Sequence, residues 1–180
     1  MGFVESSDAV YIATHNGRYT IDGGRMYASG HPDPIVSTNA NLGLVSSTDQ
    51  GKSWSAVSLN GTADFHDLEI SHSSRGQTTI YGRDGANAVI LVGRDGGSTW
   101  TSGAALAMRD IAACPALPGT IYGTTSDGVK VSHEHAASFE FSPDALTLSV
   151  VATSTRVVAD QRGIVASSDL GATSRILVTH

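Results

Sequence analysis

The chain has 180 residues, with 17 Asp and Glu against 11 Lys and Arg, and 40% of its residues are hydrophobic. This length predicts one soluble domain with a substantial core. The acidic balance argues against nucleic acid as a partner, because nucleic-acid proteins need a basic surface. No apolar run reaches the roughly 20 residues of a membrane span, and the first residues lack the pattern of a signal peptide. The single cysteine, Cys114, excludes an internal disulfide.

Composition and hydrophobic pattern favour an all-β fold. Gly, Ser and Thr are abundant in the chain, and all three are poor helix formers. The apolar residues come in short runs rich in Val, Ile, Thr and Tyr, which is typical of strands. These runs are residues 10–14, 42–47, 88–93, 120–125, 148–153 and 175–179. Many short strands separated by turns indicate a sandwich, a barrel or a propeller.

A repeated eight-residue motif decides between these folds in favour of a propeller. Residues 47–54 read S-x-D-x-G-x-S-W, and residues 93–100 read G-x-D-x-G-x-T-W. Residues 167–174 keep this pattern without the Trp, residues 132–139 are a decayed copy, and residues 20–27 are a fifth candidate. The acidic positions of the four later copies lie about 40 residues apart, which is the period of a four-stranded propeller blade. An antiparallel sandwich is the weaker alternative.

A second repeat of apolar, Tyr and small residues indicates the second strand of each blade. Its copies are residues 10–13, 26–29, 80–82, 121–123 and 157–159, and the inner strands are predicted at 65–71, 109–114 and 146–152. We therefore predict a single all-β propeller domain over residues 1–180, with about four to five four-stranded blades. Full blades are expected at 64–104, 105–143 and 144–180, and residues 1–63 are expected to hold shortened, degenerate blades.

The eight-residue motif resembles the Asp-box (BNR) repeat of sialidases, sortilin-type receptors, xyloglucanase-like glycosidases and photosystem assembly propellers. Segments 11–17, 27–34, 42–54 and 63–71 are similar to a bacterial, glycosyl-hydrolase-like group of Asp-box propellers. The resemblance implies that Asp boxes are structural turns placed away from the ligand face. It also implies an exported, extracytoplasmic protein, although the chain itself leaves localisation unknown.

Two physical features of such a turn give further expectations. Asp and Ser side chains hydrogen-bond the amides of the turn, and Gly supplies the positive φ. These roles make Asp49, Asp95 and Asp169 scaffold residues. The aromatic residue of the motif packs between neighbouring blades, so Trp54 and Trp100 are expected to be buried there.

The residues leave open whether the protein is an enzyme. A glycoside hydrolase acting on a polysaccharide needs two carboxyl groups roughly 5–10 Å apart. The candidates are Asp33, Asp64, Asp67, Asp84, Asp127 and Asp160. No Gly-x-Ser-x-Gly nucleophile motif is present, and Cys114 in a predicted inner strand fits a small buried hydrophobe better than a nucleophile. No catalytic residue is assigned.

Three histidines favour a binding function over catalysis. His15 and His31 follow second strands, and His66 opens an inner strand. Those strand ends lie on one face of a propeller, so we predict that the three imidazoles meet there and bind Cu or Zn. Asp33 or Asp64 would serve as a fourth ligand or as a hydrogen-bond acceptor. The pair His133 and His135 has H-x-H spacing but lies inside the decayed box.

The sequence thus predicts a non-catalytic propeller that binds a divalent metal, or else a small ligand, carbohydrate or protein, with glycoside hydrolysis as the alternative. An open blade edge would favour homo-oligomers.

Overall fold

The computed structural model describes residues 3–5, 10–12, 17–22, 24–31, 40–114, 117–141, 147–151, 156–160, 163–167 and 175–178, with side-chain surroundings given for 24–31, 40–114 and 117–141. All regular secondary structure in these ranges consists of β-strands. No helix of the described residues is long and apolar enough to cross a membrane. The predicted all-β fold is confirmed.

Sixteen of the strands form four antiparallel sheets of four strands each. The first sheet holds β3 (Gly17–Asp22), β4 (Arg25–Gly30), β5 (Leu44–Ser47) and β6 (Ser55–Ser58). The second holds β7 (Phe65–His72), β8 (Thr78–Asp84), β9 (Val89–Gly93) and β10 (Thr101–Ala105). The third holds β11 (Asp110–Ala113), β12 (Ile121–Thr125), β13 (Gly128–Ser132) and β14 (Glu140–Phe141). The fourth holds β15 (Thr147–Val151), β16 (Arg156–Asp160), β17 (Gly163–Ser167) and β18 (Arg175–Val178).

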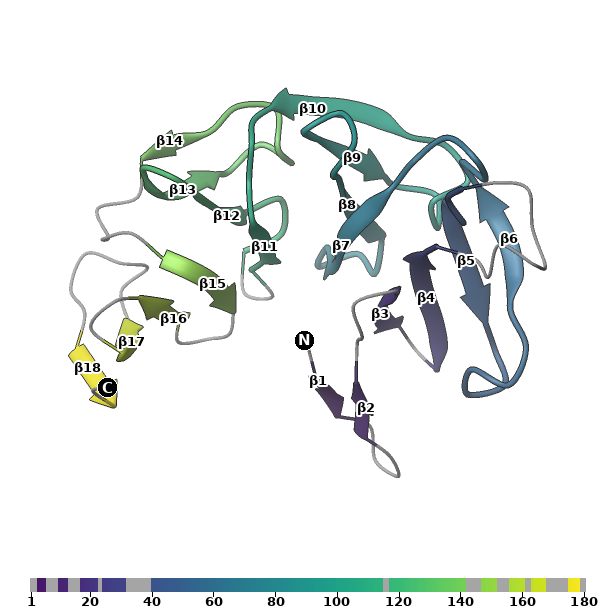
Figure 1. Cartoon of the computed structure of the whole chain (residues 1–180), viewed down its shortest axis with the longest axis horizontal. Coiled ribbons are helices and arrows are strands. Elements are labelled where there is room, and N and C mark those ends of the chain that lie inside the picture. Colours follow the sequence, from purple (N-terminus) through teal and green to yellow (C-terminus); the bar gives the residue numbers. More distant parts are fainter. Residues whose placement is uncertain are drawn as a thin grey trace.

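Within each sheet the strands pair in chain order, so every sheet is an up-and-down meander. The four sheets follow one another along an open arc (Figure 1). Their first strands contact one another in turn, β3 with β7, β7 with β11 and β11 with β15. This is the arrangement of propeller blades around an axis, with the first strand of each blade innermost.

Residues 1–63, where the sequence predicts shortened blades, contain the whole first sheet and a two-stranded sheet of β1 (Phe3–Glu5) and β2 (Val10–Ile12). The interpretation of residues 20–27 as a fifth Asp box is wrong. Asp22 pairs with Arg25 in the hairpin of β3 and β4, whereas the boxes at 47–54, 93–100, 132–139 and 167–174 connect the third and fourth strands of their sheets.

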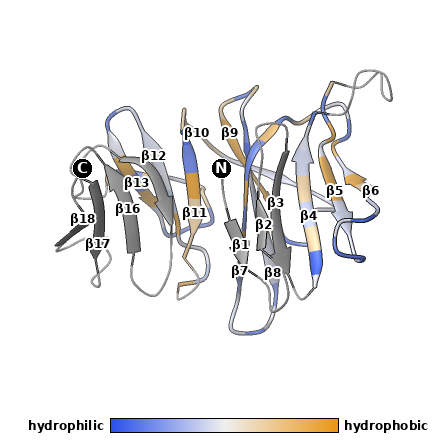
Figure 2. Cartoon of the chain, turned by 60° about the horizontal axis from the view of Figure 1, so that its bottom comes forward, coloured by the Kyte–Doolittle hydropathy of each residue, from blue (hydrophilic) through white to orange (hydrophobic). Residues whose placement is uncertain are grey.

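Apolar side chains fill the space between successive sheets. Tyr27 and Leu44 of the first sheet pack with Phe65 and Ile80 of the second, and a comparable cluster joins the second sheet to the third through Tyr81, Ile90, Ile111 and Ile121. Figure 2 shows hydrophobic residues concentrated in strands such as β5 and β11 and hydrophilic residues in the turns. Burial between sheets is the main stabilising contribution here.

One burial prediction is wrong. Trp54 is 41% exposed, whereas Trp100 is partly buried against the core between the first and second sheets. Trp100 lies against β6, the fourth strand of the preceding sheet, through a hydrogen bond to Ser58. In the described part of the chain, the sheet that precedes Trp54 consists of β1 and β2, and none of its described strands corresponds to β6.

Candidate functional site

The two ends of each sheet carry different residue types. In an antiparallel meander, the turn between the third and fourth strands lies opposite the turn between the second and third. The Asp boxes occupy the first kind of turn. The connections after second strands and before first strands meet at the other end, where the sequence predicts the ligand face.

The first Asp box uses its polar atoms to close its own turn. The Oγ of Ser47 donates to Asp49 Oδ1 at 2.7 Å and accepts the N–H of Gly51 at 2.9 Å. The Asp49 carboxylate accepts the N–H and Oγ–H of Ser53 at 2.9 and 2.6 Å. The hydrogen bonds from Ser53 hold the pKa of Asp49 well below its usual range. This carboxylate is engaged in the scaffold.

The other boxes repeat parts of this network. Asp95 accepts the N–H and Oγ1–H of Thr99 at 2.9 and 2.6 Å, which lowers its pKa in the same way. In the decayed box, Ser132 Oγ still accepts the N–H of Ala136 at 3.1 Å. Asp169 lies outside the described residues. The geometry agrees with the structural role that the resemblance implies.

The two histidines of the decayed box, His133 and His135, contact different residues and do not form a common site. His135 Nδ1 lies 2.8 Å from the hydroxyl of Tyr81 in the preceding sheet, and burial lowers its pKa. His133 Nε2 lies 3.9 Å from Glu140 Oε1. His135 therefore belongs to the contact between the second and third sheets.

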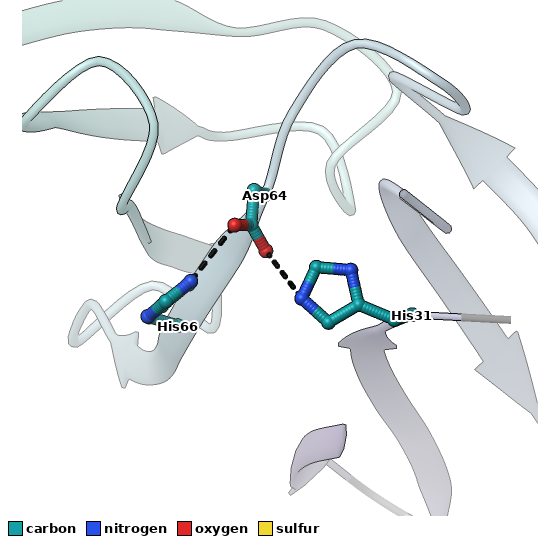
Figure 3. A group of neighbouring side chains, drawn as sticks. All are labelled: His31, Asp64 and His66. Atoms are coloured by element: carbon teal, nitrogen blue, oxygen red, sulfur yellow. Dashed lines mark hydrogen bonds and ion pairs between the residues drawn. The ribbon is translucent and has the colours of Figure 1, made fainter. Parts of the chain in front are cut away.

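His31, Asp64 and His66 come together at the opposite end of the sheets (Figure 3). His31 directly follows β4, and Asp64 and His66 flank the first residue of β7. Asp64 lies between the two imidazoles, with Oδ2 at 2.8 Å from His66 Nε2 and Oδ1 at 3.5 Å from His31 Nε2. One ligand atom from each residue lies within 4.8 Å of the other two.

Backbone contacts of the neighbouring loops hold His31 in this position. Its Nδ1 lies 3.0 Å from the carbonyl oxygen of Ala40, which favours the tautomer with a proton on Nδ1 and leaves Nε2 free as an acceptor or ligand. The N–H of Leu42 bonds the carbonyl of Gly30 at 2.9 Å. Leu42 is thereby held against the end of β4.

The described residues before β5, 40–43, are joined to the connection that carries Asp64. The N–H of Gly61 bonds the carbonyl of Asn41, and the side-chain amide of Asn60 bonds the carbonyl of Leu42. Gly43 has φ of 64°, and a Cβ there would collide with the backbone of Leu59. Only glycine permits this close approach.

His66 occupies a position that a glycine opposite keeps open. A Cβ on Gly85 would stand 2.7 Å from His66 Cδ2, and the N–H of Gly85 bonds the carbonyl of Asp64 at 2.8 Å. The His31 and His66 side chains are each 49% exposed and that of Asp64 is 16% exposed. Solvent and ions therefore reach both imidazoles, while the carboxylate between them is fixed.

The structure brings together two of the three predicted histidines, with Asp64 between them. His15 and Asp33 lie outside the described residues. Two imidazoles and a carboxylate at this spacing form a ligand set that zinc and copper accept.

The other predicted carboxylates have separate environments. Asp84 accepts from the Ala86 N–H and from the Asn87 amide within one turn, and Asp127 accepts from Ser126. Asp160 pairs through its backbone in β16. These contacts fit turn and strand residues more than a catalytic pair.

A group of acidic residues on inner strands was not predicted as a unit. Asp67 Oδ2 accepts the N–H of Ile111 at 2.9 Å, and Glu69 Oε2 accepts the N–H of Ala113 at 3.2 Å. Burial, followed by the neighbouring Asp110 carboxyl, raises the pKa of Asp67 above its usual range. Burial raises the pKa of Glu69 to about 8. The sequence signal for this group is the spacing of Asp67 and Glu69, which lie two positions apart and so on the same face of the predicted strand.

These two side chains bind the edge of the next inner strand. Ile111 and Ala113 lie in β11, and their N–H groups point to the edge that β12 does not occupy, so that Asp67 and Glu69 serve as the acceptors a neighbouring strand would provide. Cys114 is buried beside Tyr122, in agreement with its interpretation as a small core residue.

Four-stranded meanders in an arc, each with the Asp box between its third and fourth strands, define this chain as an Asp-box β-propeller of the BNR type. No family model matches the chain. The xyloglucanase of Hypocrea jecorina is 30% identical over 132 residues, which cover 71% of this chain and 15% of that protein.

This chain also spans less than two thirds of the length of the similar solved structures. YCF48 from Cyanidioschyzon merolae has 18% identity and a TM-score of 0.44, over 63% of this chain and 40% of the other. The Hadza microbial sialidase Hz136 has 16% identity and a TM-score of 0.46, over 87% and 43%. With TM-scores this low, these similarities add nothing to the fold already evident from the strand order.

Proposed function

We propose that this protein is a non-catalytic binding propeller that holds a divalent transition-metal ion at His31, Asp64 and His66. The observation that carries the proposal is the convergence of three ligand atoms, from residues 31, 64 and 66, within 4.8 Å of one another. His15, the third imidazole expected from the sequence, stays a prediction.

The donor set indicates which ions to expect. Imidazole nitrogen suits Zn, Cu, Ni and Fe, whereas Ca and Mg prefer sites made of oxygen ligands. Zinc or copper is the expected ion. Three protein ligands leave at least one coordination position for water or for a donor atom of a small ligand, carbohydrate or protein. Because both imidazoles are half exposed, a bound ion would be able to exchange with ions in solution. By its resemblance to exported propellers, the protein would act outside the cytoplasm.

Calorimetric titration with Zn²⁺ and Cu²⁺ tests the proposal. The wild-type chain should bind one ion, and His31→Ala, His66→Ala and Asp64→Asn should each weaken binding at least tenfold. His133→Ala is the matched control, because His133 is similarly exposed at 53% and also lies beside a carboxylate. Absence of binding, or equal binding by all variants, would refute the metal site.

Glycoside hydrolysis stays the alternative prediction, and Asp67 is the predicted carboxylate whose surroundings favour it most. Its side chain is hydrogen-bonded to Asp110 and lies near Glu69, and a carboxyl group with a raised pKa is suited to act as a general acid. However, Asp67 is only 7% exposed, and its carboxyl oxygens accept hydrogen bonds from the N–H groups of Leu68 and Ile111. Both features leave it little access to a substrate. A screen on β-glucans, xyloglucan and sialosides tests it; turnover that Asp67→Asn abolishes would replace the binding proposal.

A further inference from the structure

The three residues of the proposed metal site belong to two different sheets. His31 follows β4 in the first sheet, whereas Asp64 and His66 lie at the start of β7 in the second sheet. Figure 3 shows His31 approaching Asp64 from one side and His66 from the other. An ion bound by all three would therefore bridge the boundary between the two sheets.

The protein alone makes only a weak connection between these side chains. His31 Nε2 and Asp64 Oδ1 are 3.5 Å apart, and the imidazole is 49% exposed. A contact of this length at a half-exposed side chain contributes little to stability, whether or not the imidazole is charged. The same two sheets are also joined by a buried cluster that includes Leu44, Phe65 and Ile80 and by the hydrogen bond of Trp100 to Ser58.

We infer that the bound ion acts as a staple between the first and second sheets, so that metal occupancy sets how readily they separate at this face. The inference rests on the proposed metal binding. Coordination would replace the 3.5 Å contact with metal–nitrogen bonds of about 2.0–2.1 Å on both imidazoles. Separating the sheets would then break a coordination bond, and binding to the folded form alone stabilises that form.

Two backbone amides report separately on the two sides of the site. The N–H of Leu42 bonds the carbonyl of Gly30, next to His31, and the N–H of Gly85 bonds the carbonyl of Asp64. A staple should slow hydrogen exchange at both amides together. An ion held by Asp64 and His66 alone should slow exchange at Gly85 and leave Leu42 unchanged.

The test is amide hydrogen exchange by NMR on the whole chain, with and without Zn²⁺ at about 100 times the dissociation constant measured by calorimetry. We expect exchange at Leu42 and Gly85 to slow at least tenfold, and the equilibrium constant of unfolding to fall roughly 100-fold. In His31→Ala, zinc should still slow Gly85 but no longer Leu42. His31→Gln retains a polar side chain and replaces the Ala variant if that variant fails to fold. His133→Ala should behave as wild type.

The outcomes separate the staple from the metal site itself. If calorimetry shows zinc binding that His31→Ala weakens, but Leu42 exchanges at the same rate with and without zinc, the staple is wrong and the metal site stands. If His31→Ala shows the same protection as wild type, the staple is wrong and the ion is held without His31. If calorimetry shows no binding, both proposals fail.

Discussion

The indole Nε1–H of Trp100 donates a hydrogen bond of 2.9 Å to the Oγ of Ser58, in the fourth strand of the preceding sheet. Ser58 Oγ–H in turn donates to the carbonyl of Gly97, inside the same Asp box as Trp100. The Trp100 ring also lies 5.1 Å from the ring of Phe65, between centroids. The box of one sheet is thus bonded to the outer strand of the sheet before it.

The two Trp residues of the boxes should differ in their effect on stability, although they occupy the same motif position. Trp100→Ala should lower the free energy of unfolding by about 3 kcal/mol, because it removes a packed indole and its hydrogen bond. Trp54→Ala is the matched control and should cost less than about 1 kcal/mol, because Trp54 is 41% exposed. Urea denaturation measures both; equal losses would contradict the interface role of Trp100.

Removing the carboxylate of the first Asp box should destabilise the fold in a pH-dependent way. Asp49→Asn should lower Tm by about 2–5 °C at pH 7, because it weakens the bonds from Ser53. Since the folded pKa is lowered, this stabilisation is present above the ordinary pKa of 3.8 and is lost as the pH falls below it. Calorimetric melts from pH 7 to pH 3 measure the effect, with the exposed Thr48→Ala as control. If the Tm of Asp49→Asn stays below that of wild type by the same amount from pH 7 to pH 3, the Asp49 carboxylate is not the stabilising group.

Glu69 should make the protein less stable as the pH rises. Its pKa is raised from 4.5 to about 8 in the folded state, so the folded chain holds the proton more tightly than the unfolded chain. Its stabilising effect is complete below pH 4.5 and is lost as the pH rises toward 8, by at most about 1.4 kcal/mol per pH unit. Urea denaturation at several pH values in this range gives the free energy of unfolding as a function of pH, and its slope against pH should be smaller for Glu69→Gln than for wild type. The exposed Glu140→Gln should leave the slope unchanged, and an unaltered slope in Glu69→Gln would show that Glu69 is not the group responsible.

A methyl group on Gly85 should displace His66 from Asp64. In Gly85→Ala the new Cβ would stand 2.7 Å from the imidazole, so the ring must turn away. We expect a changed ¹⁵N shift of His66 Nε2 and at least tenfold weaker zinc binding. Ala86→Ser, at an exposed position of the same turn, is the control. An unshifted His66 signal would contradict the steric role of Gly85.

The sequence by itself determined the fold class and the repeat. Strand runs rich in Val, Ile and Tyr, and the motif at 47–54 and 93–100, are local signals, because strand preference and tight-turn chemistry depend on nearby residues. For that reason the predicted inner strand at 65–71 corresponds to Phe65–His72. Topology alone also indicated that His31 and His66 share one end of the sheets.

Only the tertiary structure decided which groups meet across sheets. Burial of Trp54 could not be predicted from its motif, since it depends on whether the preceding sheet supplies an outer strand. The bonds from Asp67 and Glu69 to Ile111 and Ala113 join residues 44 positions apart, and the contact of His31 with Asp64 depends on loops held by Gly43 and Leu42. Such contacts are set by the packing of one sheet against the next, and no local sequence preference encodes that packing.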